Sequence, residues 1–137
     1  MTRKPERVTV EDMRQHVRNL CKKHAISLQA VDRGRRAYAI PEFHEIGIPL
    51  IRSAISYATA MHEIGHHRGH HQNSRRTMVR ERWAWRWARS NSLIWTPAME
   101  RSSLEALEWY ASRVAKIDRK QAQIRRHERA HDKGADR

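Results

Sequence analysis

A chain of 137 residues with one cysteine and a net charge of +13 fits a single small domain that has no internal disulfide. No apolar run approaches the roughly 20 residues of a membrane span, and no apolar signal-peptide segment follows the basic N-terminus. We therefore expect a cytoplasmic protein that has no membrane partner.

The positive charge is concentrated at the two ends of the chain. Lysine and arginine outnumber aspartate and glutamate by 10 to 4 in residues 1–40 and by 9 to 4 in residues 113–137, but only by 9 to 7 in residues 41–112. Such basic flanks can contact an anionic partner such as nucleic acid, although ordinary solvated helix faces are the simpler explanation, because neither flank contains a recognisable nucleic-acid-binding motif. A nucleic-acid contact through the flanks therefore stays open.

The first predicted element is an amphipathic helix. Thr9 is a suitable N-cap, and apolar residues recur at helical spacing through residues 10–20, so we expect the helix to end near His24. Cys21 falls near the end of this helix. A single cysteine in that position is expected to be a buried free thiol, not a zinc ligand or a nucleophile.

Short apolar runs that follow the helix predict strands. Residues 25–31 and 36–40 flank a turn at Gly34, which indicates a hairpin. Residues 46–51 form a third run, which contains Pro49. Because proline cannot donate to a strand ladder, this run is expected to be an edge strand or its margin.

The next predicted helix carries the strongest functional signal in the chain. Ser53 is a suitable N-cap, and residues 62–66 read H-E-x-x-H. Two histidines four residues apart project from one face of a helix, so His62 and His66 can bind one zinc ion. Glu63 would then stand beside the attacking water as a general base. The alternative is a histidine-rich helix whose imidazoles lie at the surface.

A catalytic zinc site needs a third protein ligand, and Glu81 is the candidate. Glu81, Ala84 and Ala88 share one helix face, on which the alanines would allow close packing against the first motif. The tryptophans at 83, 85 and 87 alternate as in a strand, but the same residues also fit a helix. The helix is preferred because Glu81 matches a motif of the protein family that is described below.

The C-terminal part of the chain reads as one helix followed by a basic extension. Thr96 is a suitable N-cap, and Pro97 suits the first turn. We expect residues 1–112 to form a single metallopeptidase domain. Residues 113–137 would be a basic helical extension that frays into a disordered tail near Gly134.

Together the two motifs resemble the ImmA/IrrE family of zinc metallopeptidases. The similarity extends over residues 36–108 and rests on H-E-I-G-H at 62–66 and E-x-x-A-x-x-W-A at 81–88. The chain departs from the family pattern at Trp85, where asparagine or aspartate is usual, and at Trp87, where phenylalanine is usual. The 14 residues between the motifs also make a short spacing for this family.

The elements and the resemblance together predict an α+β fold, in which a small antiparallel or mixed sheet packs on a zincin-type active-site helix with further helices around it. His62, His66 and Glu81 would hold Zn²⁺, and Glu63 would be the catalytic base of a metalloendopeptidase. The resemblance implies a protein substrate such as the transcriptional repressor of a phage or mobile element. In zincins, an extended peptide docks on an edge strand beside the active-site helix.

Two questions are left open by the sequence. The group that stabilises the oxyanion could be Tyr38, Tyr57 or one of the histidines in 67–71, and His44 could line the cleft. The protein could also be a non-enzymatic basic adaptor that binds nucleic acid or an acidic protein and keeps a structural or decayed metal site.

Overall fold

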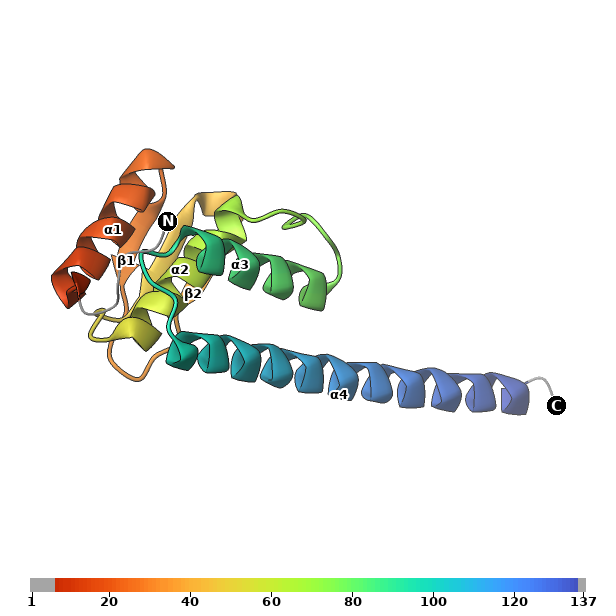
Figure 1. The fold of residues 1–137 in the computed structure, drawn as a ribbon. Helices are drawn as coiled ribbons and strands as arrows, with labels where there is room; N and C mark the ends of the chain where they lie inside the picture. The colour runs from red at the N-terminus through yellow and green to blue at the C-terminus, as the bar shows by residue number, and fades with distance from the viewer. Residues whose placement is uncertain (1–6, 136–137) are drawn as a thin grey trace.

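The computed structural model describes residues 7–135, which form an α+β fold with a three-stranded mixed sheet (Figure 1). The expectations for residues 1–6 and for the tail beyond residue 135 lie outside this range, whereas Gly134, near which the tail was expected to begin, is still in the last helix. The elements in chain order are α1 (Val10–Lys23), β1 (Ser27–Ala30), β2 (Tyr38–Ile40), the 3₁₀ turn η2 (Pro41–Phe43), β3 (Glu45–Ile48), α2 (Ala54–Arg68), α3 (Thr77–Asn91) and α4 (Pro97–Ala135).

Helix α1 begins and ends where the sequence predicts. The side chain of Thr9 accepts a hydrogen bond from the Asp12 N–H at 3.0 Å, and the Asp12 carboxylate accepts one from the Thr9 N–H at the same distance. This reciprocal cap satisfies two backbone donors at the start of the helix. Cys21 is buried, and burial raises the pKa of its thiol to about 11. The expectation of a buried free thiol is therefore confirmed.

The strand order is β1-β3-β2, so two expectations about the sheet are wrong. Residues 25–31 and 36–40 do not form a hairpin, because β3 lies between them, parallel to β1 and antiparallel to β2. The run at 46–51 supplies this central strand instead of an edge strand. Its Pro49 follows the last paired residue, where it costs no ladder hydrogen bond.

Burial explains why β3 takes the centre of the sheet. Ile46 and Ile48 are buried, whereas all four residues of β1 are exposed. The ring of Tyr38 on β2 lies over Gly47, its cross-strand partner, where a side chain at 47 would collide with it. The turn predicted at Gly34 is present, with a positive φ of 88° and a hydrogen bond from Arg35 N to Asp32 O. It leads into a crossover instead of a hairpin.

Helix α2 is the central element of the fold. It begins after the predicted N-cap Ser53 and contacts α1, α3, α4, β2 and β3. Tyr57, Ala58, Met61 and Ile64 along it are completely buried. Figure 1 shows α2 between the sheet and the pair α3 and α4. Side chains on α2 are therefore held by contacts on several sides.

Helix α4 has 39 residues and is about 58 Å long at 1.5 Å per residue. Thr96 caps it as expected, accepting a hydrogen bond from the Met99 N–H at 3.2 Å. Its first turns pack on the body, and the remainder projects away from it (Figure 1). The expected domain boundary at residue 112 falls inside this helix, so the separate extension and its nucleic-acid contact stay predictions. None of the described helices is long and apolar enough to cross a membrane.

Candidate metal centre

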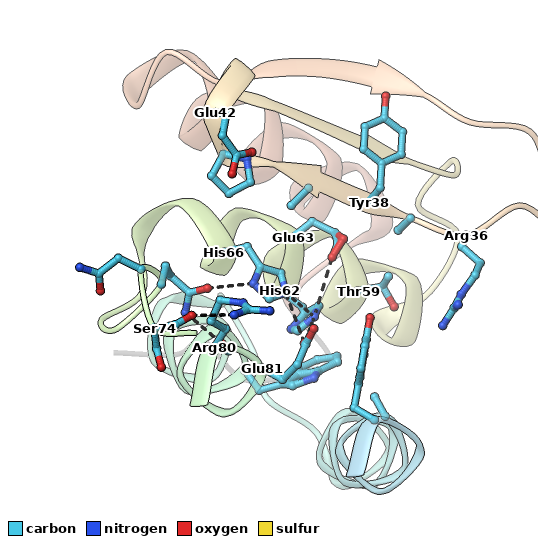
Figure 2. A pocket seen from close by; sticks show the side chains of 18 of the residues that line it. Arg36, Tyr38, Glu42, Thr59, His62, Glu63, His66, Ser74, Arg80 and Glu81 are labelled. Carbon is cyan, nitrogen blue, oxygen red and sulfur yellow. Dashed lines mark hydrogen bonds and ion pairs between the residues drawn. The ribbon is translucent and has the colours of Figure 1, made fainter. Parts of the chain in front are cut away.

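Helices α2 and α3 bring three potential metal ligands together. His62 and His66 project from one face of α2, with their Nε2 atoms 3.2 Å apart. Glu81 on α3 places its Oε2 atom 3.0 Å from His62 Nε2 and 3.3 Å from His66 Nε2. The three donor atoms therefore form a nearly equilateral triangle (Figure 2).

Small residues at the contact between α2 and α3 make this triangle possible. Gly65 lies between the two histidines, and a side chain at this position would overlap the backbone carbonyl of Ala84. Ala84 and Ala88 on the facing side of α3 are completely buried. The close approach of the two helix backbones lets the short carboxylate side chain of Glu81 reach both imidazoles, as its position beside the alanines predicted.

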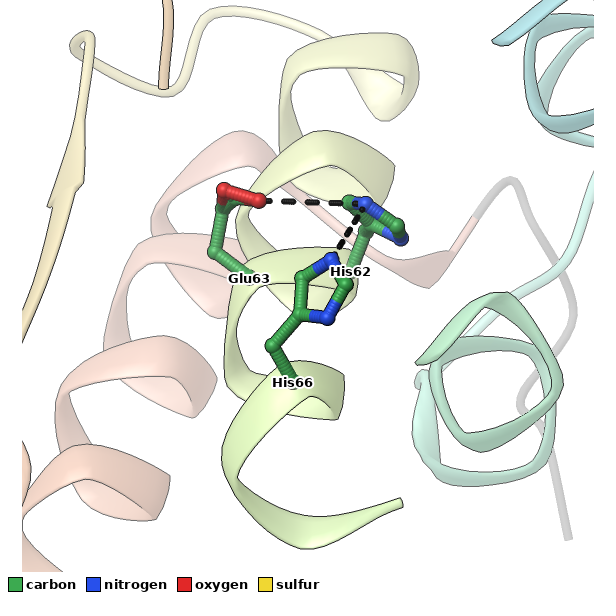
Figure 3. A group of neighbouring side chains, drawn as sticks. All are labelled: His62, Glu63 and His66. Carbon is green, nitrogen blue, oxygen red and sulfur yellow. Dashed lines mark hydrogen bonds and ion pairs between the residues drawn. The ribbon is translucent and has the colours of Figure 1, made fainter. Parts of the chain in front are cut away.

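Glu63 lies at the edge of the same group. Its Oε1 atom is 3.8 Å from His62 Nε2, and the side chain is buried (Figure 3). Potential ligand atoms of His62, Glu63 and His66 all lie within 4.8 Å of one another, so this set could hold a metal ion. Of the two carboxylates, Glu81 is closer to His62 and also contacts His66. Glu81 therefore lies between the two imidazoles, whereas Glu63 lies beside them.

The burial of the group shifts its proton affinities in different directions. Burial raises the pKa of Glu63 to about 7. Burial also acts to raise the pKa of Glu81, but the contacts with His62 and His66 outweigh it and lower this pKa to about 2. For His62 burial dominates and lowers the pKa, whereas for His66 the contacts with Glu81 outweigh burial and raise it. Near neutral pH, Glu81 is therefore ionised, and Glu63 is close to its midpoint.

Gln72, in the loop between α2 and α3, fixes the orientation of His66. The Gln72 Nε2 donates to the backbone carbonyls of His70 and Arg80, at 3.2 and 2.9 Å. Because carbonyls only accept, the Gln72 Oε1 must face His66 Nδ1, which lies 2.9 Å away and donates to it. This leaves the lone pair of Nε2 free for a metal. The sequence showed only a polar linker here and gave no signal for this role.

Trp85 occupies the position at which the chain departs from the ImmA/IrrE pattern, and it stacks on His62. The ring centroids are 4.1 Å apart and the planes are inclined by 23°. His62 Nδ1 is buried without a hydrogen-bond partner, as is the Trp85 ring nitrogen. The His62 ring is therefore oriented by stacking instead of by a hydrogen bond to its second nitrogen, the usual arrangement for a metal-binding histidine.

An open cavity of about 910 Å³ adjoins the cluster of His62, Glu63, His66 and Glu81, which we call the metal group because it could hold a metal ion. One wall is β2 with the segments on either side of it, and the floor includes His62, Glu63 and His66 from α2. The α2–α3 loop, α3 and the first half of α4 complete the lining. Helix α4 contributes Ser102, Ala106 and Tyr110. The sequence did not indicate that α4 would border the site.

The tyrosines considered for the oxyanion role are both engaged elsewhere. Tyr57 is completely buried; its hydroxyl lies 2.6 Å from His16 Nδ1 and accepts a hydrogen bond from Leu93 N at 2.9 Å. The Tyr38 hydroxyl donates to Glu45 Oε2 at 2.7 Å and points away from the metal group (Figure 2). Neither hydroxyl is therefore directed at a substrate bound beside the metal group.

The histidines of 67–71 that were considered for that role lie elsewhere, and so does His44, which was considered for the lining of the cleft. His67 Nε2 lies 3.0 Å from the backbone carbonyl of Glu45. His70 and His71 are exposed and contact the ring of Trp83. His44 is exposed in a left-handed conformation, at the end of η2. Among the described residues that line the cavity, none of these four is present.

Tyr110 on α4 was missed by the sequence analysis, yet it is the tyrosine that lies beside the group. It lines the cavity, and burial together with the charges of Glu81 and Glu63 raises the pKa of its hydroxyl. A polar contact with Glu81 adds to this shift. Helical spacing in the sequence places Tyr110 on an apolar face of the C-terminal helix. The sequence does not show which part of the protein this face packs against.

No protein-family model matches the chain, and no curated protein or solved structure is significantly similar to it. The residues of the site form a buried group of histidine and glutamate side chains that could hold a metal ion, beside a cavity large enough for a peptide segment.

Proposed function

We propose that this protein is a zinc-dependent peptidase of the H-E-x-x-H type, similar to the ImmA/IrrE family. The observation that carries the proposal is the triangle of His62 Nε2, His66 Nε2 and Glu81 Oε2, with sides of 3.0, 3.2 and 3.3 Å. A tetrahedral zinc ion with bonds of about 2.0–2.1 Å places its ligand atoms about 3.3–3.4 Å apart. The triangle is thus close to one face of that tetrahedron.

The state of the Glu81 oxygen supports a metal over a simple ion pair. Glu81 Oε2 is buried and has no hydrogen-bond partner of ordinary geometry, although two imidazole nitrogens lie close to it. Buried carboxylate oxygens are seldom left in this condition. Three potential ligand atoms within 3.3 Å of one another, one of them on a ring that Gln72 orients, suit a cation bound among them.

In the proposed reaction, His62, His66 and Glu81 would hold the zinc ion, and Glu63 would move the proton. A zinc ion at such a site would lower the pKa of water to about 7 and polarise a carbonyl group. Glu63 accepts a proton from the attacking water and later gives it to the leaving amine.

The proposed substrate is an extended segment of a protein, such as the repressor of a phage or mobile element. It would pair with the free edge of β2, which lines the cavity and ends the sheet on that side. This replaces the 46–51 segment as the docking strand, because both edges of β3 are already paired. The edge of β2 exposes backbone groups that a peptide can satisfy.

Tyr110 is proposed to donate a hydrogen bond to the oxyanion that forms from the scissile carbonyl. Replacing Tyr110 by phenylalanine is expected to lower kcat by about 10²–10³, the usual effect of losing one such donor, with little change in KM. Zinc content should be unchanged because Tyr110 is not a proposed ligand. Tyr38→Phe is the matched control and should keep kcat within about twofold. Equal losses in both variants would contradict this role.

The metal site is tested by elemental analysis of the purified protein after dialysis against a weak chelator. We expect about one zinc per chain in the wild type and a large loss in Glu81→Ala, because two remaining ligands hold zinc poorly. The exposed Glu105 on α4 supplies a control, since Glu105→Ala should retain the metal. Wild-type protein that holds no zinc would overturn the proposed function.

A further inference from the structure

The cavity wall is positively charged outside the metal group. Arg36, Arg75 and Arg80 line it, and Glu42 is the only lining carboxylate among the described residues besides Glu63 and Glu81. When both are ionised, Glu81 and Glu63 would together offset the charge of a bound Zn²⁺. The remaining wall thus has three guanidinium groups against one carboxylate. Figure 2 shows Arg36 on one side of the metal group and Arg80 on the other.

Of the three arginines, Arg36 is held in place but not neutralised. Its guanidinium group lies over the ring of Trp109 on α4, 4.2 Å from the centroid. Arg113 is also stacked on Trp109, at 4.8 Å. No carboxylate among the described residues forms an ion pair with Arg36, whereas its charge reaches Glu63 and acts to lower the pKa of that group. Arg36 is therefore an oriented cation with free donors, close to the proposed base.

Arg80 and Arg75 are less suited to the same task. The guanidinium group of Arg80 already donates hydrogen bonds to the backbone carbonyl of Ser74 at 2.6 Å and to the Thr77 hydroxyl at 3.3 Å. Arg36 and Arg75 are both exposed, but Arg75, on the α2–α3 loop, has no aromatic ring beneath its guanidinium group among the described residues. A planar guanidinium group held on an aromatic ring is already oriented. The side chain of Arg36 therefore loses less conformational entropy when a ligand binds to it.

We propose that Arg36 binds a carboxylate of the substrate next to the scissile bond, so that the protein selects acidic peptides. This inference rests on the proposed peptidase function and names its substrate class. The carboxylate can come from an aspartate or glutamate side chain or from the C-terminus of the peptide, since both present the same planar pair of oxygens to a guanidinium group. Arg36 is here a specificity-determining residue and takes no part in proton transfer.

The sheet predicts on which side of the scissile bond this carboxylate lies. Arg36 precedes β2 by two residues, so it stands at the N-terminal end of that strand. A peptide that pairs antiparallel with β2 approaches Arg36 with its C-terminal side. The acidic group is therefore expected on the C-terminal side of the cleaved bond.

The test uses the zinc-loaded protein and a pool of proteome-derived peptides. Half of the peptides carry an amide in place of the C-terminal carboxyl group. Cleavage sites are read by mass spectrometry and compared with those in a Glu63→Gln control. We expect aspartate and glutamate to be enriched on the C-terminal side of the cut. Cleavage only of peptides with a free C-terminus close to the cut would identify the terminal carboxylate as the ligand instead.

Matched variants then assign the preference to Arg36. In Arg36→Gln, the ratio of kcat/KM for a glutamate peptide to that for its glutamine counterpart should fall about 10- to 100-fold, as expected for a lost charge-assisted hydrogen bond. Arg113→Gln removes the same charge from a group that is not part of the cavity lining and should change the ratio less than threefold. Cleavage with no acidic preference, or an equal effect of both variants, would overturn the proposal.

A binding measurement separates this inference from the peptidase proposal. Immobilised zinc-loaded Glu63→Gln protein is exposed to the same peptide pool, and the retained peptides are identified. We expect acidic peptides to be retained, and Arg36→Gln in the same background to lose this enrichment. Retention of acidic peptides together with no cleavage by the wild type would contradict the peptidase function but not the role of Arg36 in binding. Retention of peptides regardless of their charge would contradict the role of Arg36.

Discussion

Glu63→Gln is expected to lower the rate of peptide cleavage by about 10²–10⁴ while zinc content and the thermal unfolding temperature stay at wild-type values. Glutamine has nearly the same shape but cannot accept the proton of the attacking water. Zinc should remain because Glu63 Oε1, 3.8 Å from His62 Nε2, lies farther from the imidazoles than Glu81 does. The measurements are elemental analysis, thermal unfolding and the peptide-pool cleavage assay.

His62→Ala is the comparison that separates chemistry from metal binding. This variant should lose both zinc and activity, because it removes one of the three ligands. A Glu63→Gln protein that cleaves as fast as the wild type would show that Glu63 is not the base, even if the metal site survives. Zinc in the wild type with no cleavage of any peptide would favour the non-enzymatic alternative, in which the metal site is structural or decayed.

Gly65→Ala is expected to destabilise the fold and to weaken zinc binding together. The added Cβ would overlap the backbone carbonyl of Ala84, which cannot rotate away as a side chain can. Overpacking costs about 3 kcal/mol in such a case, and the better helix propensity of alanine returns about 1 kcal/mol, so the free energy of unfolding should fall by about 2 kcal/mol. Separation of α2 from α3 would also draw Glu81 away from the histidines.

Urea unfolding and a zinc-chelator competition would measure both effects. Gly34→Ala is a suitable control: Gly34 has a φ of 88° and no atom within 4 Å of an added Cβ, so only backbone strain of about 1 kcal/mol is expected. That variant should bind zinc as the wild type does. If Gly65→Ala unfolds at the wild-type urea concentration and retains its zinc affinity, the close contact between α2 and α3 is not what positions Glu81.

The local features of the protein were determined by the sequence alone. Thr9, Ser53 and Thr96 cap helices where expected, because capping depends on a side chain and a backbone N–H only three residues away. The juxtaposition of His62 and His66 follows in the same way from the 3.6-residue period of a helix. The α+β class was predicted from a run of strand patterns between helix patterns, together with the resemblance to the ImmA/IrrE family.

Glu81 is an intermediate case. Its helix and its alanine-lined face could be inferred from the residues around it, and the structure brings it to the two histidines. The inference rested on Ala84 and Ala88, because small residues on a helix face allow close packing. The structure adds Gly65 as the small residue that faces them on α2. Its role as a ligand stays a prediction until the metal is measured.

The tertiary structure alone decided the strand order and the other walls of the site. A short apolar run has the same periodicity at the centre of a sheet as at its edge, so the position of β3 between β1 and β2 depended on which run could bury both faces. Tyr110, Gln72 and the pair of Arg36 and Trp109 reach the site from segments that are distant in the chain or irregular. Their positions follow from how α4 and the loops pack around α2, and such long-range packing leaves no periodic trace in the sequence.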